Sequence, residues 1–62
     1  MPYVRIEMLE GRSDEQKAKL AHAITHAMME HAGAKPESVN IVIEDVKKNN
    51  WAVAGTMMSQ KK

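Results

Sequence analysis

The residue with the clearest capacity for chemistry is Pro2, which directly follows Met1. If Met1 is retained, Pro2 is an ordinary first residue of a strand, a position that needs no backbone N–H for the ladder. If Met1 is removed, Pro2 becomes a free N-terminal secondary amine that can act as a base, a nucleophile or a cation. The position of Pro2 by itself leaves both interpretations open.

Arg12 and Trp51 are further candidates, and the distance between Arg12 and Pro2 limits how they can act together. Arg12 follows the expected first strand, at the carboxyl end where the ligand sites of parallel sheets gather. Pro2 begins the same strand, so roughly 20 Å separate the two at the usual rise per residue. A small pocket that contains both must therefore lie between subunits. The alternative is that Arg12 is a solvated loop residue and Trp51 anchors an interface.

The histidines suggest a metal site only weakly. His22 and His26 are spaced i, i+4, as in some zinc sites. They fall on the outer face of the expected helix, and no third ligand is evident. His31, near the end of that helix, fits a partner for the helix dipole better than a ligand. We therefore expect neither a metal nor a cofactor.

The size and composition of the chain favour a single small domain, spanning residues 1–62, that needs partner subunits. The chain has 62 residues, no Cys and a net charge of +1. A chain this short buries only about 60% of its unfolded surface, and without Cys it cannot add disulfides. No basic patch suggests nucleic acid as a partner, and no apolar run could span a membrane. The expectation is a soluble, cytoplasmic homo-oligomer.

The first half of the chain predicts a strand followed by a helix. Apolar and charged residues alternate over residues 3–9, as in a half-buried strand. Ser13 and Gln16 form a capping-box pattern at the start of a helix, which Gly33 ends after about Ala32. The face of this helix that packs on the sheet is predicted to carry Leu20, Ile24, Ala27, Met28 and His31.

The second half predicts another strand and a small hairpin. Residues 39–46 are rich in β-branched side chains, and the run Ile41-Val42-Ile43 suggests burial on both faces. Residues 51–58 form a candidate hairpin that turns near Gly55, and residues 59–62 form a polar tail expected to fray.

Strand, helix and strand within about 45 residues make one βαβ unit with parallel strands and a right-handed crossover. Two strands do not form an independent sheet, and their open edges invite pairing with another chain. The expected fold is therefore α/β: a βαβ unit with a C-terminal β-hairpin, whose strands pair across subunits into a four-stranded sheet per dimer. The second face of that sheet would still need cover, which argues for assembly beyond the dimer.

Three stretches of the chain, residues 2–4, 8–17 and 51–55, resemble the 4-oxalocrotonate tautomerase family of the tautomerase superfamily. The most specific is the run Leu-Glu-Gly-Arg-Ser-Asp-Glu-Gln-Lys, together with the proline after Met1. The similarity covers almost the whole chain. It implies a homohexamer, a trimer of dimers with active sites between subunits, and a place in aromatic hydrocarbon catabolism.

The resemblance also implies roles for individual residues. Pro2, once Met1 is removed, would be the general base that carries a proton between carbons of a dienol or enol substrate. Arg12 would bind a substrate carboxylate, Leu9 would line the pocket, and Trp51 stands where the family has an aromatic residue. An apolar wall and the charge of Arg12 would both disfavour the protonated amine, so the base would work near neutral pH.

Asn40 departs from the family pattern, because the best-known members have a second arginine there. That arginine polarises the carbonyl oxygen near the developing enolate, whereas Asn40 can donate a hydrogen bond but brings no charge. We expect an isomerase, a cofactor-free tautomerase of the 2-hydroxymuconate type. Two alternatives remain open: a hydratase or dehalogenase of the same superfamily in which protonated Pro2 acts as an acid, and a non-catalytic oligomeric binding protein.

Overall fold

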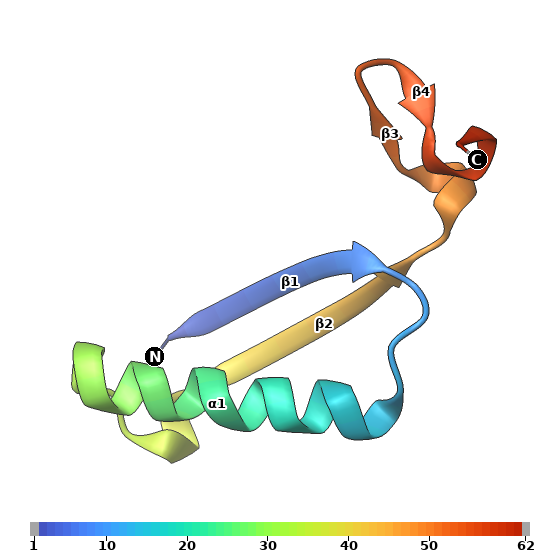
Figure 1. Cartoon of the computed structure of the whole chain (residues 1–62). Helices are drawn as coiled ribbons and strands as arrows, with labels where there is room; N and C mark the ends of the chain where they lie inside the picture. The colour runs from blue at the N-terminus through green and yellow to red at the C-terminus, as the bar shows by residue number, and fades with distance from the viewer. Residues whose placement is uncertain (1, 62) are drawn as a thin grey trace.

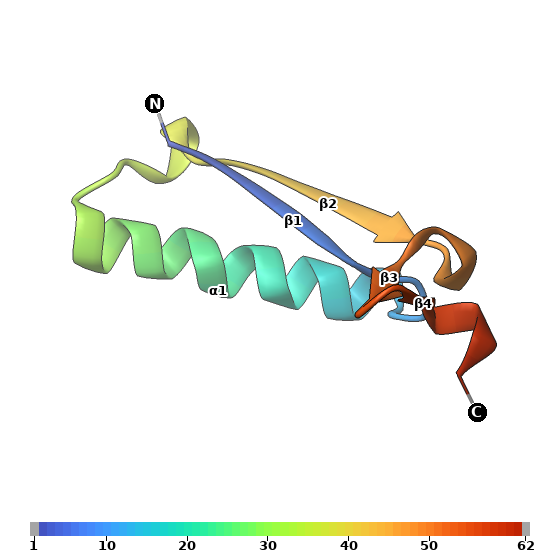
Figure 2. The same ribbon diagram turned by 90° about the horizontal axis from the view of Figure 1, so that it is seen from above.

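Two parallel strands form the centre of the computed structural model, which describes residues 2–61. Strand β1 (Tyr3–Leu9) lies beside strand β2 (Asn40–Val46), in register from the pair Tyr3–Asn40 to the pair Leu9–Val46. Helix α1 (Asp14–Ala32) connects the two strands and lies along one face of the sheet (Figures 1 and 2). The opposite face is left open. The predicted βαβ unit is confirmed, with a second strand that begins one residue later than expected.

Helix α1 starts and stops where the local sequence predicts. The Ser13 hydroxyl accepts a hydrogen bond from the backbone N–H of Gln16 at 3.1 Å, and the Gln16 side chain accepts one from the Ser13 N–H at 2.9 Å. These two bonds satisfy donors that the first helical turn would otherwise leave unpaired. Gly33 ends the helix with φ of 67°, the left-handed conformation that glycine adopts without strain.

The face of α1 that packs on the sheet differs in part from the predicted one. Its half-buried residues are Lys17, Leu20, Ala21, Ile24, Thr25 and Met28. Ala27 and His31, which the sequence placed on this face, are exposed. The helix has 19 residues and the strands have seven, so a helix of about 29 Å overhangs strands of about 23 Å. His31 lies in that overhang, and Ala27 lies on the flank of the packed stripe.

A hairpin follows the sheet, as predicted. A 3₁₀ turn (Lys48–Asn50) leads to strand β3 (Ala52–Val53), which pairs antiparallel with strand β4 (Thr56–Met57). Ala54 and Gly55 between them have φ of 53° and 80°, and two left-handed residues are what a tight hairpin turn requires. The hairpin projects beyond the carboxyl end of β2, away from the sheet (Figure 1).

The polar tail differs from its prediction. Instead of fraying after the hairpin, residues Met58–Gln60 form a further 3₁₀ turn, in which the N–H of Lys61 donates to the Met58 carbonyl at 3.3 Å. Lys62 lies outside the described residues. A third 3₁₀ turn, Pro36–Ser38, lies between α1 and β2.

The single chain has no enclosed core. No side chain within residues 2–61 is fully buried, and Val42, predicted to be covered on the β2 strand, is 41% exposed. The radius of gyration is 14.6 Å, against about 10.6 Å for a compact chain of this length. The accessible surface is 4861 Å², against roughly 4,000 Å² for a compact protein of this mass. The chain by itself is therefore more extended than a compact domain of its length.

The sequence contains no apolar run long enough to span a membrane, and the helix of the structure can be checked against this expectation. Between residues 2 and 61, no helix is both long enough and apolar enough to cross a bilayer.

Candidate functional site

Pro2 and Asn40 are neighbours at the amino end of the sheet. Pro2 immediately precedes β1, and its carbonyl accepts a hydrogen bond from the backbone N–H of Asn40 at 3.0 Å. The Asn40 side chain is exposed, and its Nδ2 donates to the Ser38 carbonyl at 3.3 Å. The parallel register therefore brings the predicted base and the predicted hydrogen-bond donor together. Met1, whose removal would free the Pro2 amine, lies outside the described residues.

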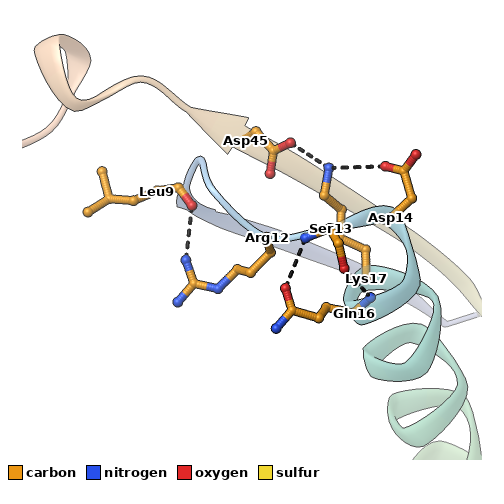
Figure 3. A network of polar contacts seen from close by, with 7 residues as sticks. All are labelled: Leu9, Arg12, Ser13, Asp14, Gln16, Lys17 and Asp45. Carbon is orange, nitrogen blue, oxygen red and sulfur yellow. Dashed lines mark hydrogen bonds and ion pairs between the residues drawn. The ribbon is translucent and has the colours of Figure 1, made fainter.

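Leu9 and Arg12 form a second group at the carboxyl end of β1. The Arg12 Nη1 donates to the Leu9 carbonyl at 3.0 Å, which holds the guanidinium next to the strand end (Figure 3). Gly11 allows the chain to turn between them, since its φ of 130° is a conformation that residues with a Cβ rarely adopt. Arg12 is exposed and forms no ion pair with any residue from 2 to 61. Its positive charge is therefore available to an anionic ligand.

A pocket of about 170 Å³ lies beside Arg12, between β1 and the first turns of α1. Its lining residues are Met8, Arg12, Gln16, Lys17 and Leu20. Sequence reasoning did not select Gln16 or Lys17 as site residues. The spacing contained a usable signal, because Lys17 lies on the sheet-facing stripe of α1, where a charged residue needs a partner.

The partner of Lys17 is Asp45 on β2. The Lys17 Nζ lies 2.5 Å from the Asp45 carboxylate and 3.9 Å from that of Asp14 (Figure 3). The hydrogen bond that the Lys17 ammonium donates to Asp45, together with the negative charges of Asp45 and Asp14, raises the pKa of Lys17 above its ordinary value of 10.5. The two cations of the pocket are therefore unequal: Lys17 is neutralised by a neighbour, and Arg12 is not.

Trp51 lies in a third place, at the base of the hairpin. Its carbonyl accepts a hydrogen bond from the Met58 N–H at 2.7 Å, and its own N–H donates to the Lys48 carbonyl at 3.4 Å. The side chain is half-buried. These backbone bonds hold Trp51 at the base of the hairpin.

The five predicted site residues therefore form three separate groups within one chain. The seven residues of β1 put about 23 Å between the Pro2 end and the Arg12 end of the sheet. One chain therefore does not bring these groups to one small ligand.

His22 and His26 are both exposed on the outer side of α1, and His26 lies 3.8 Å from Glu30. Across the described chain, no group of three His, Asp or Glu side chains is arranged to hold a metal ion.

Comparison with known proteins connects these groups to one family. The model of the tautomerase enzyme family matches residues 2–61. The 2-hydroxymuconate tautomerase of Bacillus subtilis (strain 168) is 48% identical over 59 residues, which is 95% of both chains. A 2-hydroxymuconate tautomerase of Comamonas testosteroni is 47% identical over 55 residues, covering 89% of this chain and 87% of that relative.

Solved structures agree with the sequence relatives. The crystal structure of YwhB, a homologue of 4-oxalocrotonate tautomerase, has a TM-score of 0.95 at 44% identity and covers 98% of this chain and 100% of that one. A heterohexamer 4-oxalocrotonate tautomerase from Chloroflexus aurantiacus J-10-fl has a TM-score of 0.93 at 39% identity, with 100% of both chains covered. The resemblance noted in the sequence is confirmed along the length of the fold, and this chain belongs to the tautomerase family.

Proposed function

We propose that this protein is a cofactor-free tautomerase of 2-hydroxymuconate-type acids, with the Pro2 amine as the base once Met1 has been removed. The observation that supports it most strongly is the proximity of Pro2 and Asn40, since the Pro2 carbonyl accepts a hydrogen bond from the Asn40 N–H. The relatives named 2-hydroxymuconate tautomerase supply the substrate class.

The reaction needs only proton transfer. The amine nitrogen takes the proton of the enol hydroxyl, the C–O bond becomes a carbonyl, and the protonated nitrogen returns a proton to a carbon of the diene. One O–H bond breaks and one C–H bond forms, so no redox partner is required. A base that alternates between these two states works best when its proton affinity suits the working pH.

The other site residues position the substrate. Arg12, whose guanidinium has no ion-pair partner between residues 2 and 61, would hold a substrate carboxylate through two parallel hydrogen bonds. Leu9 and Trp51 would provide the apolar wall that keeps water from the amine. Asn40 would donate to the oxygen on which negative charge develops, as a neutral donor in place of a charged one.

The proposal includes assembly of several copies, since no single chain brings Pro2 and Arg12 together. The surface in excess of a compact chain is roughly 800 Å², about one partner's share of a standard protein interface. The relative from Chloroflexus aurantiacus is a heterohexamer. A homohexamer built from dimers with a four-stranded sheet is the arrangement that we propose here.

The test is intact mass on the purified protein together with ketonisation of 2-hydroxymuconate, followed by ultraviolet absorbance. We expect a mass without one methionine and measurable turnover that Pro2→Ala reduces by at least about a hundredfold, the range of general-base catalysis. Pro36→Ala is the matched control, because Pro36 is exposed in a 3₁₀ turn and its nitrogen is an internal amide that cannot act as a base. Full activity of Pro2→Ala in a sample that lacks Met1 would exclude the proposed base.

The pH profile separates the base from the alternative in which protonated Pro2 is an acid. A base must be unprotonated in the free enzyme, so kcat/KM should rise with pH through its titration. If protonated Pro2 is instead an acid, kcat/KM should fall as pH rises through the same titration.

A further inference from the structure

The pocket beside Arg12 contains two cations with different neighbours. Met8 and Leu20 supply its apolar part, and Arg12 and Lys17 supply positive charge. The Lys17 side chain is 24% exposed and its ammonium is bound to Asp45, whereas within residues 2–61 the Arg12 guanidinium donates to the neutral Leu9 carbonyl and forms no ion pair. The formal charge of this local group, counting Arg12, Lys17 and Asp45, is therefore +1.

The position of Asp45 follows from the sheet register. Asp45 is the β2 partner of Met8, so its backbone lies directly beside the pocket-lining strand. Its side chain reaches the Lys17 ammonium, which bridges α1 and β2 (Figure 3). Asp14 also approaches Lys17, at 3.9 Å, but its side chain is fully exposed, so water screens its charge.

We propose that Asp45 is a specificity-determining residue, which neutralises Lys17 and so leaves Arg12 as the single cation that a ligand can use. This inference rests on the proposed role of Arg12 as the carboxylate ligand. A pocket with one available charge suits one carboxylate of a substrate. It disfavours compact dianions such as sulfate, phosphate or a phosphate monoester, which gain most from two adjacent cations. Asp45 acts through Lys17 and is a positioning residue, not a catalytic one.

The proposal predicts that removing the charge of Asp45 changes the preference for anion charge. With Asp45→Asn, Lys17 keeps its ammonium but loses its partner, and the local charge rises from +1 to +2. An added unit charge at contact distance in water favours a monoanion about fivefold and a dianion by about the square of that. The preference for sulfate over acetate should therefore rise about fivefold at low ionic strength.

The experiment is a titration of the assembled, isotope-labelled protein with acetate and with sulfate, followed by the NMR signal of the Arg12 side-chain N–H. Three variants make it specific: Asp45→Asn, the double variant Asp45→Asn/Lys17→Gln, and Asp14→Asn. We expect the sulfate preference to rise in the first, to return to the wild-type value in the second, and to change by less than twofold in the third. Asp45→Glu should keep the wild-type preference, because it retains the carboxylate.

An unchanged ratio in Asp45→Asn, or a raised ratio that persists in the double variant, would overturn the proposal. A general loosening of the fold would alter binding of both anions in both variants, so it is distinguishable from a change in charge preference. The titration involves no turnover. A failed ketonisation assay with the expected anion ratios would therefore count against the reaction and not against the role of Asp45.

Discussion

The open face of the sheet yields the prediction that follows most directly from the structure. Val42 lies in the middle of β2, on the side that α1 does not cover, and is 41% exposed in the single chain. If copies assemble through this face, the exposed part of Val42 becomes buried. Replacing it by Thr keeps the shape and the strand preference but puts a hydroxyl in place of a methyl group.

The expected magnitude follows from the exposed fraction. Full burial of a valine side chain is worth about 1.5–3 kcal/mol, so the 41% that remains exposed corresponds to about 0.6–1.2 kcal/mol per chain. A dimer brings two copies of Val42 to the contact, or about 1.2–2.4 kcal/mol. Val42→Thr should therefore raise the dissociation constant of dimers from the larger assembly about tenfold to fiftyfold.

The assay is sedimentation velocity over a range of protein concentrations, with Met29→Gln as the control. Met29 is 40% exposed, almost the same fraction as Val42, but it lies on α1 outside the sheet-facing residues. We expect Met29→Gln to assemble like the wild type and Val42→Thr to dissociate at higher concentration. If the two variants dissociate alike, or neither does, the open face is not the surface through which dimers associate.

Three further predictions concern the two ends of the sheet. The pKa of Lys17 is raised in the folded state, so its pair with Asp45 stabilises the fold fully below pH 10.5, and this contribution is lost as pH rises through the higher folded-state pKa. In urea unfolding, Lys17→Met should therefore lose less stability than the wild type between pH 9 and pH 12. Equal losses would contradict this prediction. Gly11→Ala should cost about 1–3 kcal/mol in the same unfolding experiment, because φ of 130° strains any residue with a Cβ, and an unchanged urea midpoint would be inconsistent with that geometry. Asn40→Arg should raise kcat on 2-hydroxymuconate about tenfold, part of the 10²–10³ that an oxyanion donor contributes; a kcat at or below the wild-type value would show that Asn40 does not face the developing charge.

Local chemistry explains why the element boundaries were predictable. Ser13 with Gln16, and Gly33, satisfy backbone groups within one turn of the helix, so the signal and the structure involve the same few residues. The Ala54-Gly55 turn is similar, since its conformation depends on two adjacent residues. Sequence is informative wherever the interaction that decides the structure is short in range.

The packed face of α1 was predicted less well because a distant element decides it. His31 fits the helical period, but the helix is longer than the strands and His31 is exposed. Lys17 was not among the residues predicted to pack on the sheet, because its partner Asp45 lies 28 positions along the chain, on β2. Val42 shows the opposite case: its apolar side chain and its place in a β-branched run predicted burial, but within residues 2–61 it remains 41% exposed.

The division of the candidate site follows from the same topology. Parallel strands in register put the residue before β1 next to the first residue of β2, so Pro2 meets Asn40 whatever the rest of the chain does. The same geometry sends Arg12 to the far end, since a βαβ crossover leaves from the carboxyl end of its first strand. If Pro2 is the base and Arg12 the carboxylate ligand, as proposed, the two can meet only if one chain places its Arg12 end against the Pro2 end of another. Variants that weaken assembly should accordingly lose turnover together with the oligomer, even when every site residue is intact.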